Sequence, residues 1–163
     1  MIPASADRGR FGGRAGFSVT EIFIALFFVA VVEGATILAS DPWHHFQEAR
    51  NLQRISDINA LMNAIFMNAV DHDGTFTCAA GDVPQSPVDM TSKAGGYNIG
   101  PCLVNKYLLA LPSDPGVRET YYNSKVDYDT GYEILKNPAK RTLIIIAPHA
   151  ELGDDIQVER PLY

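Results

Sequence analysis

The sequence has only two cysteines, Cys78 and Cys102, and no CxxC pair. It also lacks a phosphate-binding P-loop and the Ser, His and Asp order of a hydrolase triad, so it carries none of the common signatures of nucleotide-binding, redox or acyl-transfer enzymes. Basic residues are scarce, since 13 Lys and Arg stand against 19 Asp and Glu, which gives a formal net charge of −6. Such an acidic surface argues against a nucleic-acid partner, which requires a basic patch.

What the chain has instead is one long apolar run, from Phe17 to Ala39, after a polar, Gly-rich and basic segment at residues 1–16. As a helix, this run is long enough to cross a hydrocarbon core of ~30 Å. Because basic residues before such a run hold that end in the cytoplasm, we expect a single-pass protein of the cytoplasmic membrane with a cytoplasmic N-terminus. Two acids within the run, Glu21 and Glu33, are unusual, since an unpaired carboxylate in hydrocarbon is costly.

Residues 42–70 continue with apolar side chains every three to four positions, which predicts an amphipathic helix. The apolar stripe comprises Phe46, Ala49, Leu52, Ile55, Ile58, Leu61, Met62, Ile65, Phe66 and Ala69, and the other side carries Glu48, Arg50, Arg54, Asp57 and Asn63. Pro42 either kinks one continuous rod over residues 17–70 or, with Asp41 as N-cap, begins a second helix. The helical region is expected to end at Asp71–Gly74.

From Thr75 onward the sequence has the alternation and turn signals of β-strands. An even number of cysteines outside the cytoplasm favours a Cys78–Cys102 disulfide, which closes a Gly- and Pro-rich loop of about 25 residues. We expect a hairpin in residues 119–136 that turns at Asp129–Gly131, a continuous apolar strand in residues 141–150 and a short strand in residues 154–160. Short connections imply antiparallel pairing, so the predicted fold class is α+β, with the amphipathic helix covering a small antiparallel β-sheet head.

The basic segment that ends in Gly16, followed by FSVTEIFIALFFVAVV, resembles the N-terminus of type IV pilin-like proteins, and the layout is closest to that of type II secretion system pseudopilins. The similarity covers the leader, the bipartite helix, the variable loop and the sheet, and it includes LPSDPG followed by a YY…GYEI hairpin. It implies the pilin fold in four segments. These are a removed leader (1–16), a transmembrane and filament-core half of the long helix (17–40), an amphipathic half (41–73) and a globular head (74–163).

In that family a prepilin peptidase cuts after the glycine and methylates the new N-terminal residue, and these two residues correspond to Gly16 and Phe17. The fifth mature residue is typically a glutamate, which Glu21 matches. An amine on Phe17 would neutralise Glu21 of a neighbouring subunit and fix the register of assembly. The resemblance therefore implies a non-enzymatic structural subunit, stored in the membrane and assembled into an extracytoplasmic or cell-surface filament. The implied partners are other copies or other pilins, the prepilin peptidase, an inner-membrane assembly platform and the lipid membrane.

Two points stay open in the sequence. Glu33 departs from the family pattern, since it lies about 18 Å further along the helix than Glu21 and ~120° around it. We expect Glu33 to snorkel to the membrane interface, the alternative being a pair with Arg50 or Arg54 of another subunit. The alternative function is a monomeric, signal-anchored extracytoplasmic binding domain or hydrolase, which would keep residues 1–16.

Metal binding has weaker support. Some pseudopilins bind calcium in the loops of the head, so Asp114, Asp127 and Asp129 are candidate ligands, with Asp154 and Asp155 as further acids, but no cluster has the spacing of a calcium loop. His44 and His45 are adjacent on a helix and expected to point apart, and we interpret them, like Asp71–Asp73, as polar linker residues. The tripeptide Asp129–Gly131 matches the DTG of aspartic proteases but lacks their apolar lead-in strand, and a hairpin turn explains it better.

Overall fold

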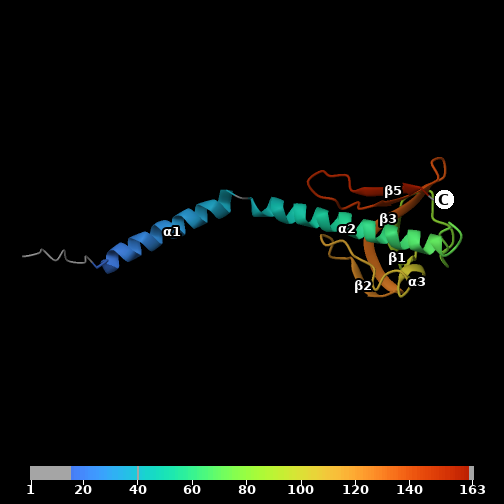
Figure 1. Cartoon of the computed structure of the whole chain (residues 1–163), viewed down its shortest axis with the longest axis horizontal. Helices are drawn as coiled ribbons and strands as arrows, with labels where there is room; N and C mark the ends of the chain where they lie inside the picture. Colours follow the sequence, from blue (N-terminus) through green and yellow to red (C-terminus); the bar gives the residue numbers. More distant parts are fainter. Residues whose placement is uncertain (1–15, 40, 162–163) are drawn as a thin grey trace, which may run out of the picture. The chain divides into compact units, whose positions relative to one another are not determined.

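The computed structural model describes residues 16–39 and 41–161, in two compact units, Met1–Pro42 and Trp43–Tyr163. The helical region consists of two helices in series, α1 (Val19–Ala39) and α2 (Pro42–Val70) (Figure 1). Of the two sequence alternatives, a second helix that begins at Pro42 is the one observed, and a fixed φ and a missing N–H suit this position at a helix start. Most of the predicted leader lies outside the described residues.

The expected membrane span is not found. In the part of the chain that the structure describes, no helix has both the length and the apolar character required to cross a bilayer. The longest stretch of α1 without a carboxylate is residues 22–32, about 16 Å of helix against a hydrocarbon core of ~30 Å. The prediction of a single-pass anchor with a cytoplasmic N-terminus is therefore wrong. Membrane storage and the snorkelling of Glu33 depended on that anchor and are withdrawn with it.

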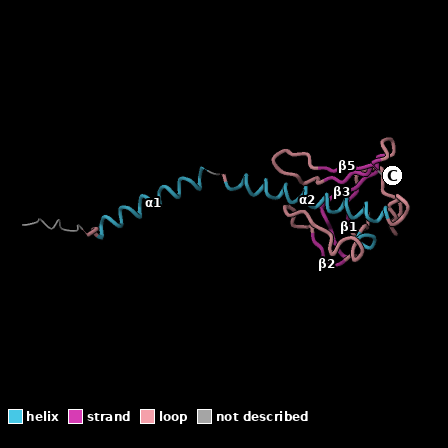
Figure 2. Tube along the Cα trace, viewed as in Figure 1, coloured by secondary structure: helices cyan, strands magenta, loops and turns pink. Residues whose placement is uncertain are grey.

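The second unit holds an antiparallel sheet of order β1-β3-β4-β5, in which β2 also pairs with β3. Figure 2 draws the strands of this unit in magenta and α2 in cyan. The strands are β1 (Val88–Thr91), β2 (Tyr121–Ser124), β3 (Asp127–Asn137), β4 (Thr142–Ile146) and β5 (Gln157–Pro161), and a short helix, α3, spans Gly100–Leu103. The strands β4 and β5 lie where the apolar and C-terminal runs predict them. The α+β class with an antiparallel sheet is therefore confirmed.

The predicted hairpin turn at Asp129–Gly131 is wrong. These residues lie inside β3, and the chain turns between β2 and β3 at Lys125–Val126 instead. Gly131 has a φ of +72°, and β3 contains more residues than β1 where it passes Asp89–Thr91. The Asp and Gly signal therefore marks an irregularity within a strand, where glycine supplies a backbone conformation that other residues avoid.

The core lies between α2 and the sheet. Its α2 side is formed by the buried residues Ile58, Leu61, Met62 and Ile65, and its sheet side includes Tyr132, Ile134, Leu143 and Ile145. The Cys78–Cys102 disulfide is confirmed, with 5.3 Å between the two Cα atoms. The loop that it closes contributes β1 to the sheet and Met90, Tyr97 and Ile99 to the core, so packing pins this loop as well as the covalent bond.

Candidate functional site

The predicted processing and assembly residues lie together at the start of α1. Gly16 and Phe17 are exposed and precede the helix, and a Cβ on Gly16 would meet nothing within 4 Å. Packing therefore does not require a glycine at this position. The carbonyl of Ser18 accepts hydrogen bonds from the backbone N–H groups of Glu21 (3.0 Å) and Ile22 (3.1 Å), which start the helix.

Glu21 is exposed in the first turn of α1, and no hydrogen bond or ion pair engages its carboxylate within the described residues. The first turn favours an acid because unpaired N–H groups and the helix dipole give that end a partial positive charge. The spacing of Ser18 and Glu21 is that of a capping box, in which the two side chains accept hydrogen bonds from backbone N–H groups at the helix start. The Ser18 hydroxyl instead makes its hydrogen bond with the hydroxyl of Thr20, at 2.7 Å.

Between Glu21 and Glu33, the surface of α1 is apolar on every side. The exposed large apolar side chains are Phe17, Val19, Ile22, Phe23, Ile24, Leu26, Phe27, Phe28, Val29, Val31 and Val32. They occupy nearly consecutive positions, so they surround the helix and do not form the single stripe of a helix packed on one partner. Since burying one large apolar side chain stabilises by ~1.5–3 kcal/mol, this surface strongly favours association with other apolar surfaces.

Glu33 lies on the same helix, beside Gly34, and the glycine does not end α1, which continues to Ala39. The suggested pairing of Glu33 with Arg54 of another subunit is inconsistent with the position of Arg54, which is buried inside its own head. Arg50 is also occupied, by Glu151 of its own chain. The role of Glu33 is therefore not explained by either sequence interpretation.

The sequence pattern misplaced Arg54, which was assigned to the solvent side of α2. Its side chain is 1% exposed, and that of Asp114 is 0% exposed. The guanidinium donates from Nε and Nη2 to the two oxygens of Asp114, at 2.8 and 2.9 Å, and from Nη1 to Glu151 at 2.9 Å. A two-bond pair of this kind is among the strongest charged contacts in proteins. Gly116 permits it, because a Cβ there would lie 2.3 Å from Nη2 of Arg54.

Glu151 connects Arg54 to a second cation. Arg50 also donates to both oxygens of Glu151, so this carboxylate faces two guanidinium groups. The two hydrogen bonds from Arg50, and then the one from Arg54, lower the pKa of Glu151 to about 2. We call Arg50, Arg54, Asp114 and Glu151 the charged cluster. Because Asp114 and Glu151 lie in loops, the charged cluster fastens both loops to α2.

Asp57 was also predicted to face solvent and is buried. Its carboxylate accepts hydrogen bonds from the hydroxyl of Tyr132 (2.8 Å) and from the amide of Gln53 (2.7 Å). Burial raises the pKa of Asp57, and the two donors oppose this effect. Burial and the bond to Asp57 also raise the pKa of Tyr132, so its hydroxyl stays protonated as a donor. Among the described residues no buried side-chain polar atom lacks a partner, which is the condition for burying such groups.

The three candidate calcium ligands do not come together. Asp114 is occupied by Arg54, Asp129 accepts from Lys93 at 2.8 Å, and Asp127 accepts from two polar side chains of β2. They do not belong to any group of three potential metal ligands in residues 16–39 and 41–161. Carboxylates engaged by cations and N–H donors lack the free oxygens that calcium requires.

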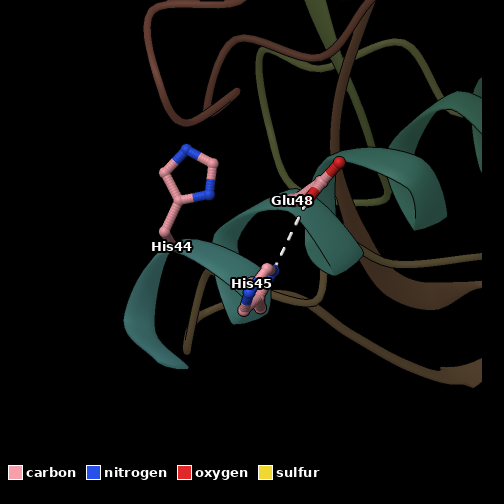
Figure 3. Close-up of side chains that lie close together, drawn as sticks. All are labelled: His44, His45 and Glu48. Carbon is pink, nitrogen blue, oxygen red and sulfur yellow. Dashed lines mark ion pairs between the residues drawn. The ribbon is translucent and has the colours of Figure 1, made fainter. Parts of the chain in front are cut away.

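One such group does occur, near the start of α2, and it consists of His44, His45 and Glu48 (Figure 3). The two imidazole rings are nearly perpendicular, at 89°, with centroids 6.1 Å apart. Even so, one ligand atom from each of the three side chains lies within 4.8 Å of the other two. Adjacent histidines on this helix therefore still place one ligand nitrogen each within 4.8 Å of the other and of a Glu48 oxygen.

Comparisons with known protein families, characterised proteins and solved structures find no match to this chain. The geometry defines an α+β protein with a separate, apolar N-terminal helix whose first turn carries an exposed acid. A functional assignment must therefore start from this helix and from the residues that precede it.

Proposed function

We propose that this chain is a non-enzymatic structural subunit of a filament of the type IV pilus or type II secretion pseudopilus kind. The single observation that carries the proposal is α1 itself, an exposed helix that is apolar on every side apart from a few polar positions. A helix of this composition requires apolar cover all round, and packing among the α1 helices of several copies supplies it. The second unit is then the pilin-type head, with α2 laid on its sheet.

Glu21 gives this association a defined register. Cleavage after Gly16 frees an amine on Phe17, four residues before Glu21. When α1 helices pack together, an unpaired carboxylate among them would be costly, and the amine of a neighbouring subunit neutralises it. The carboxylate has no partner among the described residues of its own chain, so the pair can form between subunits. Head-to-tail contacts of this kind are heterologous and produce open filaments.

Glu21→Gln tests the proposal, because it keeps the shape of the side chain and removes its charge. We produce the wild-type and variant chains in a host with a prepilin peptidase and a filament assembly platform. Mass spectrometry reports the N-terminal residue, and electron microscopy with sedimentation reports the amount of filament. We expect both chains to start at a methylated Phe17 and the variant to yield at least tenfold less filament, since an unpaired buried amine costs more than the ~1.4 kcal/mol of a tenfold change.

Glu33→Gln is the matched control, because it removes the other carboxylate of the same helix. We expect this variant to be processed and assembled at the wild-type level. A wild-type chain that keeps residues 1–16 and sediments as a monomer would contradict the filament and support a monomeric binding domain or hydrolase. A Glu21→Gln chain that assembles normally would contradict the registry role alone.

A further inference from the structure

The side chains of His44, His45 and Glu48 share one face of the first turns of α2. Glu48 follows His44 by four residues and His45 by three, and both spacings bring side chains together on a helix. At 100° per residue, Glu48 lies between the two histidines around the axis, one turn further on. The distance between Nδ1 of His45 and Oε2 of Glu48 is 3.7 Å, as the dashed line in Figure 3 marks.

These three side chains are free to move closer. The side chains of His45 and Glu48 are 68% and 58% exposed, and His44 is exposed as well. The backbone that carries them is held by the rest of α2, whose buried face begins at Asn51. With zinc bonds of ~2.0–2.1 Å, two ligand atoms of a tetrahedral site lie about 3.4 Å apart. The ligand atoms of the three side chains lie within 4.8 Å of one another, so side-chain rotations are sufficient to bring them to this distance.

We propose that His44, His45 and Glu48 form a binding site for a divalent transition-metal ion of the zinc class. Two imidazole nitrogens and one carboxylate are a ligand set that suits Zn²⁺, Ni²⁺ and Cu²⁺, whereas Ca²⁺ and Mg²⁺ prefer oxygen ligands alone. Three protein ligands leave a tetrahedral ion one open position, which water or a donor from another molecule fills. The positive end of the helix dipole opposes a cation here, so the negative charge of Glu48 is essential to the site.

Zinc titration of the full chain tests this site, with a chromophoric chelator as competitor. We expect one Zn²⁺ per chain at the site. His44→Ala, His45→Ala and Glu48→Gln should each weaken the affinity at least tenfold, and Ca²⁺ at the same concentration should not compete. His149→Ala is the matched control, because it removes an exposed histidine outside the cluster, and it should bind zinc as the wild type does. Circular dichroism checks that each exposed substitution leaves the fold unchanged.

Cobalt gives a second measurement that does not depend on affinity alone. Co²⁺ in a site with two imidazoles and a carboxylate should give a visible absorption band, and this band should disappear in His45→Ala. Zinc affinity that is unchanged when His44→Ala, His45→Ala and Glu48→Gln are combined in one chain, or that is lost in His149→Ala, would overturn the assignment. Wild-type affinity in His44→Ala would also overturn it, since the ion would then have only His45 and Glu48. The proposal does not depend on filament formation, so the two can fail separately.

Discussion

The two halves of α2 bury opposite kinds of side chain. In the second half, from Ile58 on, the face toward the sheet is mainly apolar. In the first half the buried residues are Asn51, Arg54 and Asp57, and the apolar residues Trp43, Phe46, Leu52 and Ile55 are exposed. The same helix therefore uses hydrophobic burial at one end and paired polar groups at the other. Which residues of a helix are buried is therefore determined by the loops and strands that pack against it, and not by the periodicity of its own sequence alone.

This difference has a consequence for assembly. Under the proposed function, the first half of α2 follows α1 in the chain and offers exposed apolar side chains to neighbouring subunits. The buried polar residues of this half, Asn51, Arg54 and Asp57, face the head, where Arg54 belongs to the charged cluster. Apolar residues exposed on the first half are thus available for contacts between subunits without weakening the head.

The largest expected effect comes from breaking the polar half. Arg54→Ala leaves Asp114 buried without its cation and removes one of the two donors to Glu151. Removing one partner of a buried ion pair costs about 3–5 kcal/mol, because the remaining charge stays out of water. We expect a loss of that size in the free energy of unfolding, measured by urea denaturation and circular dichroism. Arg54→Lys keeps the charge without the two-bond geometry and should lose less; a loss below about 1 kcal/mol for Arg54→Ala would contradict the argument.

The next prediction compares a buried leucine in the second half of α2 with an exposed leucine in the first half. Leu61 is 0% exposed in the apolar half, and Leu52 is 62% exposed in the polar half. Leu61→Ala removes buried methyl groups and leaves a cavity, so we expect a loss of about 3 kcal/mol in the free energy of unfolding. Leu52→Ala should change it by less than about 0.5 kcal/mol, as exposed substitutions usually do. If both variants lost the same free energy of unfolding in the urea experiment, the two leucines would not differ in burial as the structure shows.

Leu52→Ala should nevertheless lower the yield of filament under the proposed function. The reason is that a side chain exposed in the single chain is buried between subunits. Electron microscopy of the assembled product measures this yield. Leu61→Ala is the comparison, with its filament yield calculated per amount of folded chain.

The sequence predicted those features that local patterns determine. The α+β class, the strands β4 and β5 and the start of α2 at Pro42 follow from runs and turn residues that are adjacent in the chain, and the disulfide follows from the cysteine count. The burial of Arg54 was not predictable from its helix, because its carboxylate partners are 60 and 97 residues away. Asp129–Gly131 was misassigned because aspartate and glycine mark both turns and irregularities within strands. The predicted membrane span is wrong, since no helix among the described residues is both long and apolar enough to cross a bilayer.

The charged cluster should also give stability a pH dependence. The pKa of Glu151 is about 2 in the folded chain and ~4.3 in an unfolded one, so the native state favours its ionised form. Stability from this group is therefore complete above about pH 5 and is lost as the pH falls toward 2. Because the side chain is 23% exposed, screening by solvent reduces its contribution to about 2 kcal/mol. We expect Glu151→Gln to lose this amount at pH 7 in urea denaturation.

The wild type and Glu151→Gln should then converge near pH 2, where the wild-type carboxylate also becomes neutral. Taking the difference between the two chains removes the titration of the other acids, which both share. Glu159→Gln is the control, since Thr142 and the paired Lys140 also lower the pKa of Glu159, but no arginine among the described residues pairs with it. If Glu159→Gln loses less free energy of unfolding than Glu151→Gln, the additional loss at Glu151 is due to its two arginines. A difference at Glu151 that stays constant from pH 7 to pH 2 would show that shape, and not charge, is what the cluster requires at this position.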